Sequence, residues 1–281
     1  MVKIITDTTA VLPPSIAEQY RIPVVPQLIH FGDETYIEGV DIDHKTFLSK
    51  LKSSKILPKT AAPPPDFFAE HFQRLVPEGE PILCIHPSAE LSGTVRSASV
   101  AAQDFPEADI QVIDTRLVAS PLGVVVHRAA EWAEEGLDID TIHQKVIDLS
   151  HHARIYFLVA TLEYLARGGR IGGASAFLGN ALQLKPILSL EDGKVEPLAK
   201  ERTMKRALNR IKELVETQYP RQQPGYMTIM HTDVPDQAQT LSDYFQNRLE
   251  IPPPNISNLP PAIITHAGPG AVAVSFFYDH S

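Results

Sequence analysis

The chain has 281 residues, of which 43% are hydrophobic and 21% are charged, and its formal net charge is −9. This composition is typical of a folded globular protein rather than a disordered one, and the length favours two α/β domains over a single compact core. A negative charge without a Lys/Arg block argues against a nucleic-acid or anionic-membrane partner, because phosphates are normally met by a basic patch.

The N-terminal segment and the single cysteine both bear on the cellular compartment. Asp7 interrupts the first apolar run before a signal-like segment is complete, and no later apolar run reaches the length of a membrane span. Cys84 excludes an internal disulfide and lies in an apolar, strand-like run, so we expect a buried structural thiol. We therefore expect a cytoplasmic protein without a membrane span.

The first half of the chain alternates short apolar runs with helical patterns. The expected strands are Val2–Thr6, Val24–Phe31, Ile82–Ile85 and Ile110–Ile113. The expected helices are Pro14–Tyr20, Asp43–Lys52 with Asp43 as N-cap, Pro65–Leu75, Ser92–Gln103 and Pro121–Glu135. Such alternation predicts a parallel sheet with helices on both faces.

The second half has a different pattern, which begins after a charged helix that ends near His151. The expected strands are Ile155–Ala160, Leu184–Leu190, Tyr226–His231, Ala262–His266 and Val272–Tyr278, and the expected helices are Met204–Thr217 and Asp236–Arg248. The pair Asp192-Gly193 predicts a β-hairpin, because these residues accept a positive φ. The fold class is therefore α/β, with an N-terminal α/β domain over residues 1–155, a C-terminal α+β domain over residues 156–281, and a ligand cleft between them.

Hydroxyl-bearing residues follow three of the predicted strands, in the segments Asp7-Thr8-Thr9, His86–Thr94 and Asp114-Thr115. Ligands bind in the crevice at the carboxyl ends of the strands of a parallel α/β sheet. Leu91-Ser92-Gly93-Thr94 is the most specific of these segments, because a helix that begins at Ser92 presents open amide donors to an anion. Plain helix capping also explains Ser92, so both interpretations stay open at this point.

Three further segments carry side chains suited to an anion. Thr60 precedes the stiff loop Ala61–Pro65, and Arg170 follows two glycines that end a predicted helix. His266 lies in a tight turn whose glycines, Gly268 among them, allow backbone and ligand to approach closely. Each of these segments can also be explained without a ligand, as part of a turn or as exposed surface, so both interpretations stay open.

Motifs for metals and nucleotides are absent from the sequence. The eleven histidines form no helical pair with a carboxylate, and Cys84 has no companion at metal-ligand spacing. Neither a phosphate-binding glycine loop nor a dinucleotide fingerprint is present. We expect no metal site and no cofactor.

Five motifs taken in order resemble the DegV family over essentially the whole chain. They are Thr6-Asp7-Thr8-Thr9, Lys59-Thr60, Leu91-Ser92-Gly93-Thr94, Thr161–Leu165 with Arg167–Ile171, and Thr265–Gly270. The resemblance implies two α/β domains with one long-chain fatty acid between them. It also implies that Thr60 and Ser92 hold the acyl carboxylate, with Arg170 and His266 nearby. The residues expected to complete the pocket are Asp7, Thr9, Gly93, Thr94 and Gly268.

The family resemblance also bears on activity and partners. Some relatives are the fatty-acid-binding subunit of a bacterial fatty acid kinase, so it implies a non-catalytic carrier that presents a C16 or C18 acid to a separate kinase subunit. The chain departs from the family pattern at Ala61-Ala62, where relatives often have Ser-Gln, and at Thr115, where a Ser is common. We expect these departures to affect acyl selectivity.

The energetics of a fatty acid agree with such a site. Burial of about fourteen methylenes at about 0.8 kcal/mol each contributes on the order of 11 kcal/mol before the costs of association. A hydroxyl hydrogen bond to a charged group contributes only about 1.5 to 3 kcal/mol, so the polar head fixes orientation. The apolar run Ala174–Leu190 is a candidate lining for the tail.

Two other functions fit parts of the pattern. In a lipid hydrolase or acyltransferase, Ser92 would be the nucleophile, His266 the base and Asp7 the group that orients the base, although the Gly-x-Ser-x-Gly elbow is absent. In a binding module for a small anionic metabolite, the same helix start would act together with Arg170.

Overall fold

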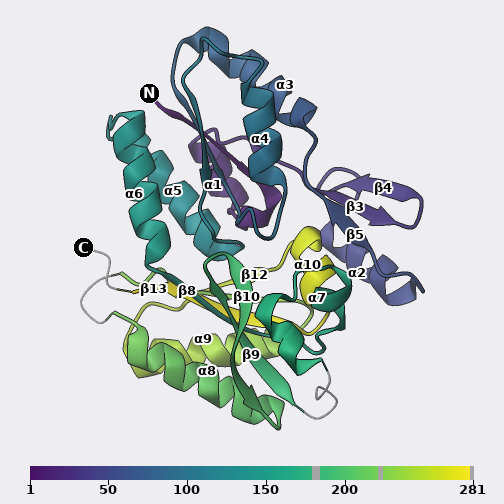
Figure 1. Cartoon of the computed structure of the whole chain (residues 1–281). Helices are drawn as coiled ribbons and strands as arrows, with labels where there is room; N and C mark the ends of the chain where they lie inside the picture. The colour runs from purple at the N-terminus through teal and green to yellow at the C-terminus, as the bar shows by residue number, and fades with distance from the viewer. Residues whose placement is uncertain (179–183, 221–223, 279–281) are drawn as a thin grey trace. The chain divides into compact units, whose positions relative to one another are not determined.

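The computed structural model describes residues 1–178, 184–220 and 224–278, and Figure 1 traces the chain from purple to yellow. The chain divides into two compact units, Met1–His151 with Pro260–Ala262 and His152–Leu259 with Ile263–Ser281. The boundary expected from the sequence, between residues 155 and 156, would fall within strand β8 (Ala153–Leu158). In the described part of the chain, no helix has both the length and the apolar character needed to cross a membrane.

A four-stranded parallel sheet in the order β2-β1-β6-β7 forms the centre of the first unit. Its strands are β1 (Lys3–Asp7), β2 (Val24–Val25), β6 (Ile82–His86) and β7 (Ile110–Asp114). Ile5 pairs with Cys84, and Cys84 pairs with Val112. Ile5 and Cys84 have no exposed surface, as expected for a parallel sheet covered on both faces. The predicted parallel sheet is confirmed.

Helices cover this sheet. The helices of this unit are α1 (Pro14–Gln19), α2 (His44–Ser53), α3 (Pro65–Leu75), α4 (Thr94–Ala102), α5 (Ser120–Glu134) and α6 (Ile139–His151), with the 3-10 turns η1 (Thr8–Ala10) and η2 (Val76–Glu78). Those that contact the strands of this sheet include α4, α5 and α6. Phe68 and Phe72 of α3 pack with Ala98 of α4 against Cys84. The pair α5 and α6 contacts β6 as well and lies across the sheet from α3 and α4 (Figure 1).

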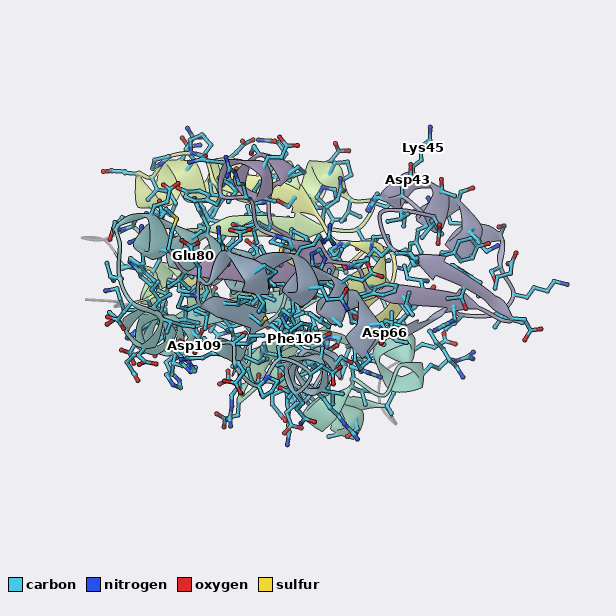
Figure 2. All side chains as sticks on the ribbon, turned by 90° about the horizontal axis from the view of Figure 1, so that it is seen from above. Asp43, Lys45, Asp66, Glu80, Phe105 and Asp109 are labelled. Atoms are coloured by element: carbon cyan, nitrogen blue, oxygen red, sulfur yellow. The ribbon has the colours of Figure 1, made fainter. Side chains whose placement is uncertain are left out.

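The start of α2 agrees with the prediction. Asp43 is its N-cap, and the Asp43 carboxylate accepts the backbone N–H of Thr46 at 2.7 Å. Figure 2 shows Asp43 and Lys45 at the outer end of this helix. The cap satisfies one of the amide donors that a helix leaves open at its first turn.

The segment Val24–Phe31 does not form the single strand that was predicted. Pro26 interrupts it, because a proline has no N–H to donate within a sheet. Val24–Val25 joins the parallel sheet, whereas β3 (Leu28–Phe31) lies in a second sheet of order β4-β3-β5, with β4 (Glu34–Ile37) and β5 (Lys59–Ala61). Gln27, which is 3% exposed, lies between the two strand segments.

The second unit contains a mixed six-stranded sheet of order β10-β9-β8-β13-β11-β12. The strands besides β8 are β9 (Lys185–Glu191), β10 (Lys194–Glu201), β11 (Thr228–His231), β12 (Asn255–Asn258) and β13 (Val272–Phe277). Helices α8 (Met204–Gln218) and α9 (Pro235–Leu249) pack on it through Ile211, Val215 and Phe245. The predicted hairpin joins β9 to β10, with φ angles of 48° at Asp192 and 79° at Gly193.

The segment Ala262–His266, predicted as a strand, lies instead within helix α10 (Pro261–Ala267). A short apolar run does not distinguish a buried strand from a short helix, and Pro261 suits the first turn of a helix. Gly268, with a φ of 76°, follows the last helical residue. The described part of this unit also contains α7 (Glu163–Arg167) and the 3-10 segment η3 (Gly172–Phe177).

Candidate functional site

Asp7 ends strand β1 and is surrounded by hydrogen-bond donors. Its carboxylate is fully buried, and Oδ1 accepts from the Thr9 N–H at 2.9 Å, the Thr9 hydroxyl at 2.6 Å and Gln27 Nε2 at 3.1 Å. Oδ2 lies 2.9 Å from Nδ1 of His86, which ends the neighbouring strand β6. Parallel strands bring their carboxyl ends to one edge of the sheet, so these two side chains meet there.

The hydrogen bonds continue from Asp7 to Ser92. Gln27 Nε2 also donates to Thr94 Oγ1 at 3.0 Å, and Thr94 Oγ1 lies 2.8 Å from Ser92 Oγ. We call the side chains of His86, Asp7, Gln27, Thr94 and Ser92 the Asp7 network. His86, Asp7 and Thr94 have no exposed surface, whereas Ser92 is only partly buried. The network therefore runs from the interior of the first unit to a serine that is only partly buried.

Ser92 is not the N-cap that the sequence predicted. Helix α4 begins at Thr94, its N-cap is Gly93, and Gly93 makes no side-chain capping bond. Ser92 Oγ accepts the backbone N–H of Thr94 at 3.3 Å, which is a local serine turn across two residues. The helix therefore starts two residues later than predicted, and Ser92 still provides an acceptor for the N–H of its first residue.

Thr60 precedes the proline segment, as predicted, and lies on β5, where it pairs with Ile29 of β3. Strand β5 ends at Ala61, and a Cβ atom on Gly93 would lie 3.5 Å from Ala62 Cβ. The segment that carries Thr60 and the turn that carries Ser92 are therefore neighbours within the first unit. The small side chain at Ala62, one of the departures from the family pattern, faces Gly93.

Arg170 and His266 belong to the second unit, where α7 and α10 position them. Arg170 Nη1 donates to the Gly168 carbonyl at 2.7 Å, and a Cβ atom on Gly168 would lie 2.1 Å from His266 Nδ1. Only a glycine at residue 168 therefore leaves room for this imidazole. Burial, together with the charge of Arg170, lowers the pKa of His266 to about 4. His266 is thus neutral at pH 7, and Arg170 supplies the positive charge.

Gly268 completes the second group of predicted residues. Its φ is 76°, and a Cβ atom there would lie 2.5 Å from the Tyr164 ring. The structure thus places the predicted residues in two groups, one in each unit. The first contains Asp7, Thr9, Thr60, Ser92, Gly93 and Thr94, and the second contains Arg170, His266 and Gly268.

Glu38 is a buried carboxyl group that the sequence analysis missed. It is 3% exposed, accepts from the Thr8 hydroxyl through Oε2, and accepts from the Ala262 N–H through Oε1 at 2.7 Å. Burial raises its pKa to about 7. The acidic residues around Glu38, such as Glu34 and Asp41, resemble a solvated loop, so no local pattern identified it.

Gln27 and His86 were also missed as site residues. The rule that ligands bind at the ends of parallel strands was enough to place His86 near Asp7, because each directly follows a predicted strand. No comparable signal existed for Gln27. Its position depends on the separation of β2 from β3, which the sequence analysis treated as one strand.

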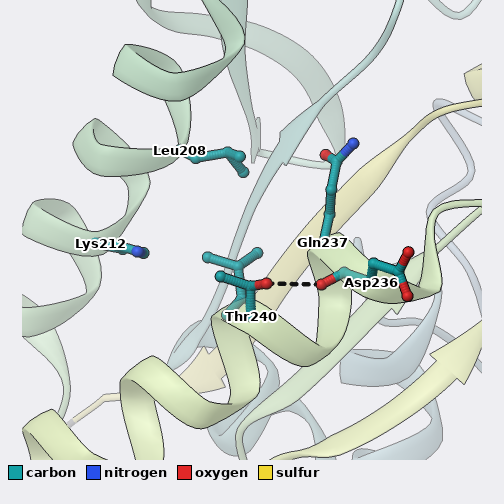
Figure 3. Close-up of a pocket in the computed structure, with 6 residues that line it drawn as sticks. Leu208, Lys212, Asp236, Gln237 and Thr240 are labelled. Carbon is teal, nitrogen blue, oxygen red and sulfur yellow. Dashed lines mark hydrogen bonds between the residues drawn. The ribbon is translucent and has the colours of Figure 1, made fainter.

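A small pocket between α8 and α9 lies apart from these residues within the second unit (Figure 3). Its lining residues are Leu208, Lys212, Asp236, Gln237, Thr240 and Leu241. Its volume of 180 Å³ is below the roughly 300 to 1,000 Å³ typical of ligand pockets. It also contains none of the predicted site residues, so we assign it no function.

The remaining sequence predictions concern metals and the acyl tail. Over residues 1–178, 184–220 and 224–278, no group of three or more His, Cys, Asp or Glu side chains is arranged to hold a metal ion. Of the predicted tail lining Ala174–Leu190, residues 179–183 lie outside the described residues. Cys84 is buried, and burial raises the pKa of its thiol, as expected for a structural cysteine.

Comparisons with known proteins agree on one family. A family model described as an uncharacterised protein of the DegV family matches residues 1–279. A DegV domain-containing protein of Streptomyces coelicolor is 37% identical over 275 residues, which are 97% of each chain. A solved fatty acid binding DegV family protein of Streptococcus agalactiae has a TM-score of 0.92 at 30% identity, covering 100% of this chain and 99% of that one. A DegV family protein of Thermus thermophilus, solved for its fatty acid binding, has a TM-score of 0.89 at 30% identity over 99% of each chain.

Proposed function

The chain belongs to the DegV family, and from that premise we propose that it binds one long-chain fatty acid, such as a C16 or C18 acid, without catalysing a reaction itself. The observation that carries this proposal is the Asp7 network, which ends in the partly buried Ser92 hydroxyl beside a glycine. The fatty acid binding of the Streptococcus agalactiae and Thermus thermophilus relatives supports the same ligand class.

We propose that Thr60 and Ser92 donate their hydroxyl hydrogens to the carboxylate. Ser92 Oγ already accepts from the Thr94 N–H, and we propose that its hydroxyl hydrogen is donated to the carboxylate rather than to Thr94 Oγ1, which lies 2.8 Å away. Gly93 is exposed and has no side chain, so an anion can approach the turn closely. Each charge-assisted bond contributes about 1.5 to 3 kcal/mol, so burial of the acyl tail dominates affinity and the hydroxyls set orientation.

Arg170 and His266 have different roles in this proposal. Arg170 supplies the positive charge that balances the carboxylate. His266 contributes a neutral N–H donor, because its lowered pKa keeps the imidazole uncharged near pH 7. Gly268 keeps the adjoining turn free of a side chain beside Tyr164. The location of the acid between the two domains stays a prediction from the family resemblance.

The hydrolase or acyltransferase hypothesis requires Asp7 to orient His266. Asp7 instead bonds to His86 and to donors from Thr9 and Gln27 within the first unit. Ser92 Oγ contacts Thr94 rather than an imidazole among its hydrogen bonds. These bonds favour a binding protein, and we propose that any phosphorylation of the bound acid is carried out by a separate kinase subunit.

Native mass spectrometry of the purified protein, followed by organic extraction, tests the proposed ligand. We expect a mass increase that matches one long-chain fatty acid, and the free acid should reappear in the extract. A protein that carries no acyl acid and is not stabilised by one, but is stabilised by a small anionic metabolite, would contradict the proposal.

The substitution Ser92→Ala tests the proposed head-group contact. Loss of one charge-assisted hydrogen bond should weaken hexadecanoic acid binding by about 10- to 100-fold. The unliganded variant should stay folded but lose about 1 to 3 kcal/mol of stability, because the buried Thr94 hydroxyl no longer has Ser92 Oγ as a partner. Ser99→Ala is the matched control, because Ser99 is an exposed serine of α4, the helix that Ser92 precedes. Equal affinities for the two variants in a lipid-exchange assay would remove Ser92 from the site.

A further inference from the structure

The bonds of the Asp7 network have a defined direction. We infer that Asp7, Gln27 and Thr94 are positioning residues that make Ser92 a hydrogen donor toward the ligand, and that this direction selects a carboxylate over an alcohol of the same chain length. The inference rests on the proposed function, because it assigns the specificity of the head-group contact at Ser92.

Asp7 fixes which groups of the network donate a hydrogen and which accept one. A carboxylate offers only acceptors, and all four bonds to Asp7 come from donor groups on Thr9, Gln27 and His86. The Gln27 side chain must therefore turn its NH₂ group toward Asp7 Oδ1 rather than its carbonyl oxygen. The backbone holds Gln27 in place on both sides, since its N–H donates to Thr8 Oγ1 at 3.1 Å and its carbonyl accepts from the Glu38 N–H at 3.0 Å.

The same NH₂ group sets the direction at Thr94. Its second hydrogen is donated to Thr94 Oγ1, so this oxygen acts as an acceptor toward Gln27. Thr94 is fully buried, and its own hydroxyl hydrogen needs an acceptor. Ser92 Oγ at 2.8 Å provides one. The opposite direction, from Ser92 to Thr94, would leave the Thr94 hydrogen buried without an acceptor among its hydrogen bonds.

Ser92 is therefore left with one possible role toward the ligand. Its oxygen accepts from both the Thr94 hydroxyl and the Thr94 N–H, and its own hydrogen points out of the network. A fatty carboxylate, which only accepts, matches that hydrogen. A fatty alcohol gives a weaker, uncharged acceptor and gains nothing from its own O–H at this position.

The substitution Gln27→Glu reverses the direction with almost no change in side-chain shape. Two carboxyl groups that share a site hold one proton between them, and the shared proton lies between Glu and Asp7. The oxygen that replaces Nε2 then accepts from the Thr94 hydroxyl. Thr94 Oγ1 in turn accepts from Ser92, and the Ser92 oxygen faces the ligand with lone pairs.

The experiment is a competition between hexadecanoic acid and hexadecan-1-ol at equal concentration, delivered from cyclodextrin to delipidated protein and measured by native mass spectrometry. The wild type should prefer the acid. Gln27→Glu should lower the ratio of bound acid to bound alcohol by at least about tenfold. Gln27→Met, which breaks the network without reversing the direction of its bonds, should lower the same ratio by about threefold.

Two substitutions at Thr94 serve as controls. In a Thr94→Val background, which disconnects Gln27 from Ser92, Gln27→Glu should change the ratio less than about twofold. Thr94→Ser, which keeps the hydroxyl, should keep the wild-type ratio.

The outcomes separate this inference from the proposed function. A wild-type ratio in Gln27→Glu, together with lost acid binding in Ser92→Ala, would overturn the inference and leave the proposed function standing. A wild type that binds neither compound would overturn both. If Gln27→Glu does not fold, neutron diffraction from deuterated wild-type crystals can determine which hydroxyl donates in the bond between Thr94 and Ser92. A deuteron on Thr94 Oγ1 directed at Ser92 Oγ supports the inference, and a deuteron on Ser92 directed at Thr94 overturns it.

Discussion

Buried polar residues of the first unit have two different electrostatic environments. The Asp7 carboxylate is surrounded by donors, including the amide of Gln27 and the ring of His86. The Glu38 carboxyl group accepts from the Thr8 hydroxyl and the Ala262 N–H, and burial is the largest influence on its pKa. The two carboxyl groups therefore differ in the donors around them, and burial disfavours the charged form of Glu38.

Burial of Glu38 makes the free energy of unfolding depend on pH. The pKa of Glu38 is about 7 in the folded protein and ordinarily 4.5, so the folded state binds more protons between these values. Stability should therefore fall as the pH rises from about 4.5 to about 7. Because a difference of one in pKa corresponds to about 1.4 kcal/mol, the loss is on the order of 3 kcal/mol.

The substitution Glu38→Gln removes this titration but keeps an acceptor for the Ala262 N–H. We expect urea unfolding of the variant to show a flatter dependence on pH from 5 to 8, with the largest gain in stability over the wild type at the upper end. Glu107→Gln, at an exposed position, is the control and should keep the wild-type profile. If both variants follow the wild-type curve, Glu38 does not titrate in this range.

At the scale of elements, two glycines that follow helical segments differ in the space available for a Cβ atom. Gly79 follows η2 with a φ of 72°, and the space around its missing Cβ is open. Gly268 follows α10 with a φ of 76°, but the Tyr164 ring occupies that space. The two positions share a left-handed backbone and differ in packing.

We predict that Gly268→Ala destabilises the protein more than Gly79→Ala. The left-handed conformation costs an alanine about 1 to 2 kcal/mol at either position. The clash with Tyr164 should add about 1 to 3 kcal/mol at residue 268 only, as overpacking does in a protein interior. Chemical denaturation of the two variants measures the difference. Equal losses would mean that Tyr164 moves aside without cost.

At the scale of the whole molecule, each unit has a hydrophobic core of its own. One core, which includes Phe72 and Cys84, packs α3 and α4 against the parallel sheet. The other, which includes Phe245 and Ile211, packs α8 and α9 against the mixed sheet. A loss of packing in one core should therefore loosen the elements of that core first.

The substitution Phe72→Ala tests this independence. Removal of a fully buried phenylalanine should cost about 3 to 5 kcal/mol. Hydrogen exchange followed by mass spectrometry should show faster exchange in β1, β6, α3 and α4, with β11 and β13 unchanged. Phe245→Ala should give the reciprocal pattern. Uniform loss of protection after either substitution would indicate one cooperative molecule.

Much of the architecture was predictable from local patterns. The parallel sheet followed from apolar runs that alternate with helical segments, and the cap at Asp43 and the hairpin at Asp192-Gly193 followed from residue types with strong backbone preferences. The family followed from five ordered motifs, and a model of the DegV family matches residues 1–279. These features depend on residues close together in the chain.

Other features depend on residues that only the tertiary structure brings together. Local periodicity did not reveal that Ala262–His266 is helical or that Pro26 separates two sheets. Ser92, Gln27 and Asp7 are joined through a fold that places the β2–β3 junction beside the start of α4, and burial of Glu38 involves Thr8 and Ala262. Burial and hydrogen bonding arise from packing between distant segments. The sequence alone therefore proposed Ser92 as a contact for the carboxylate, while only the tertiary structure shows which residues are linked to it by hydrogen bonds.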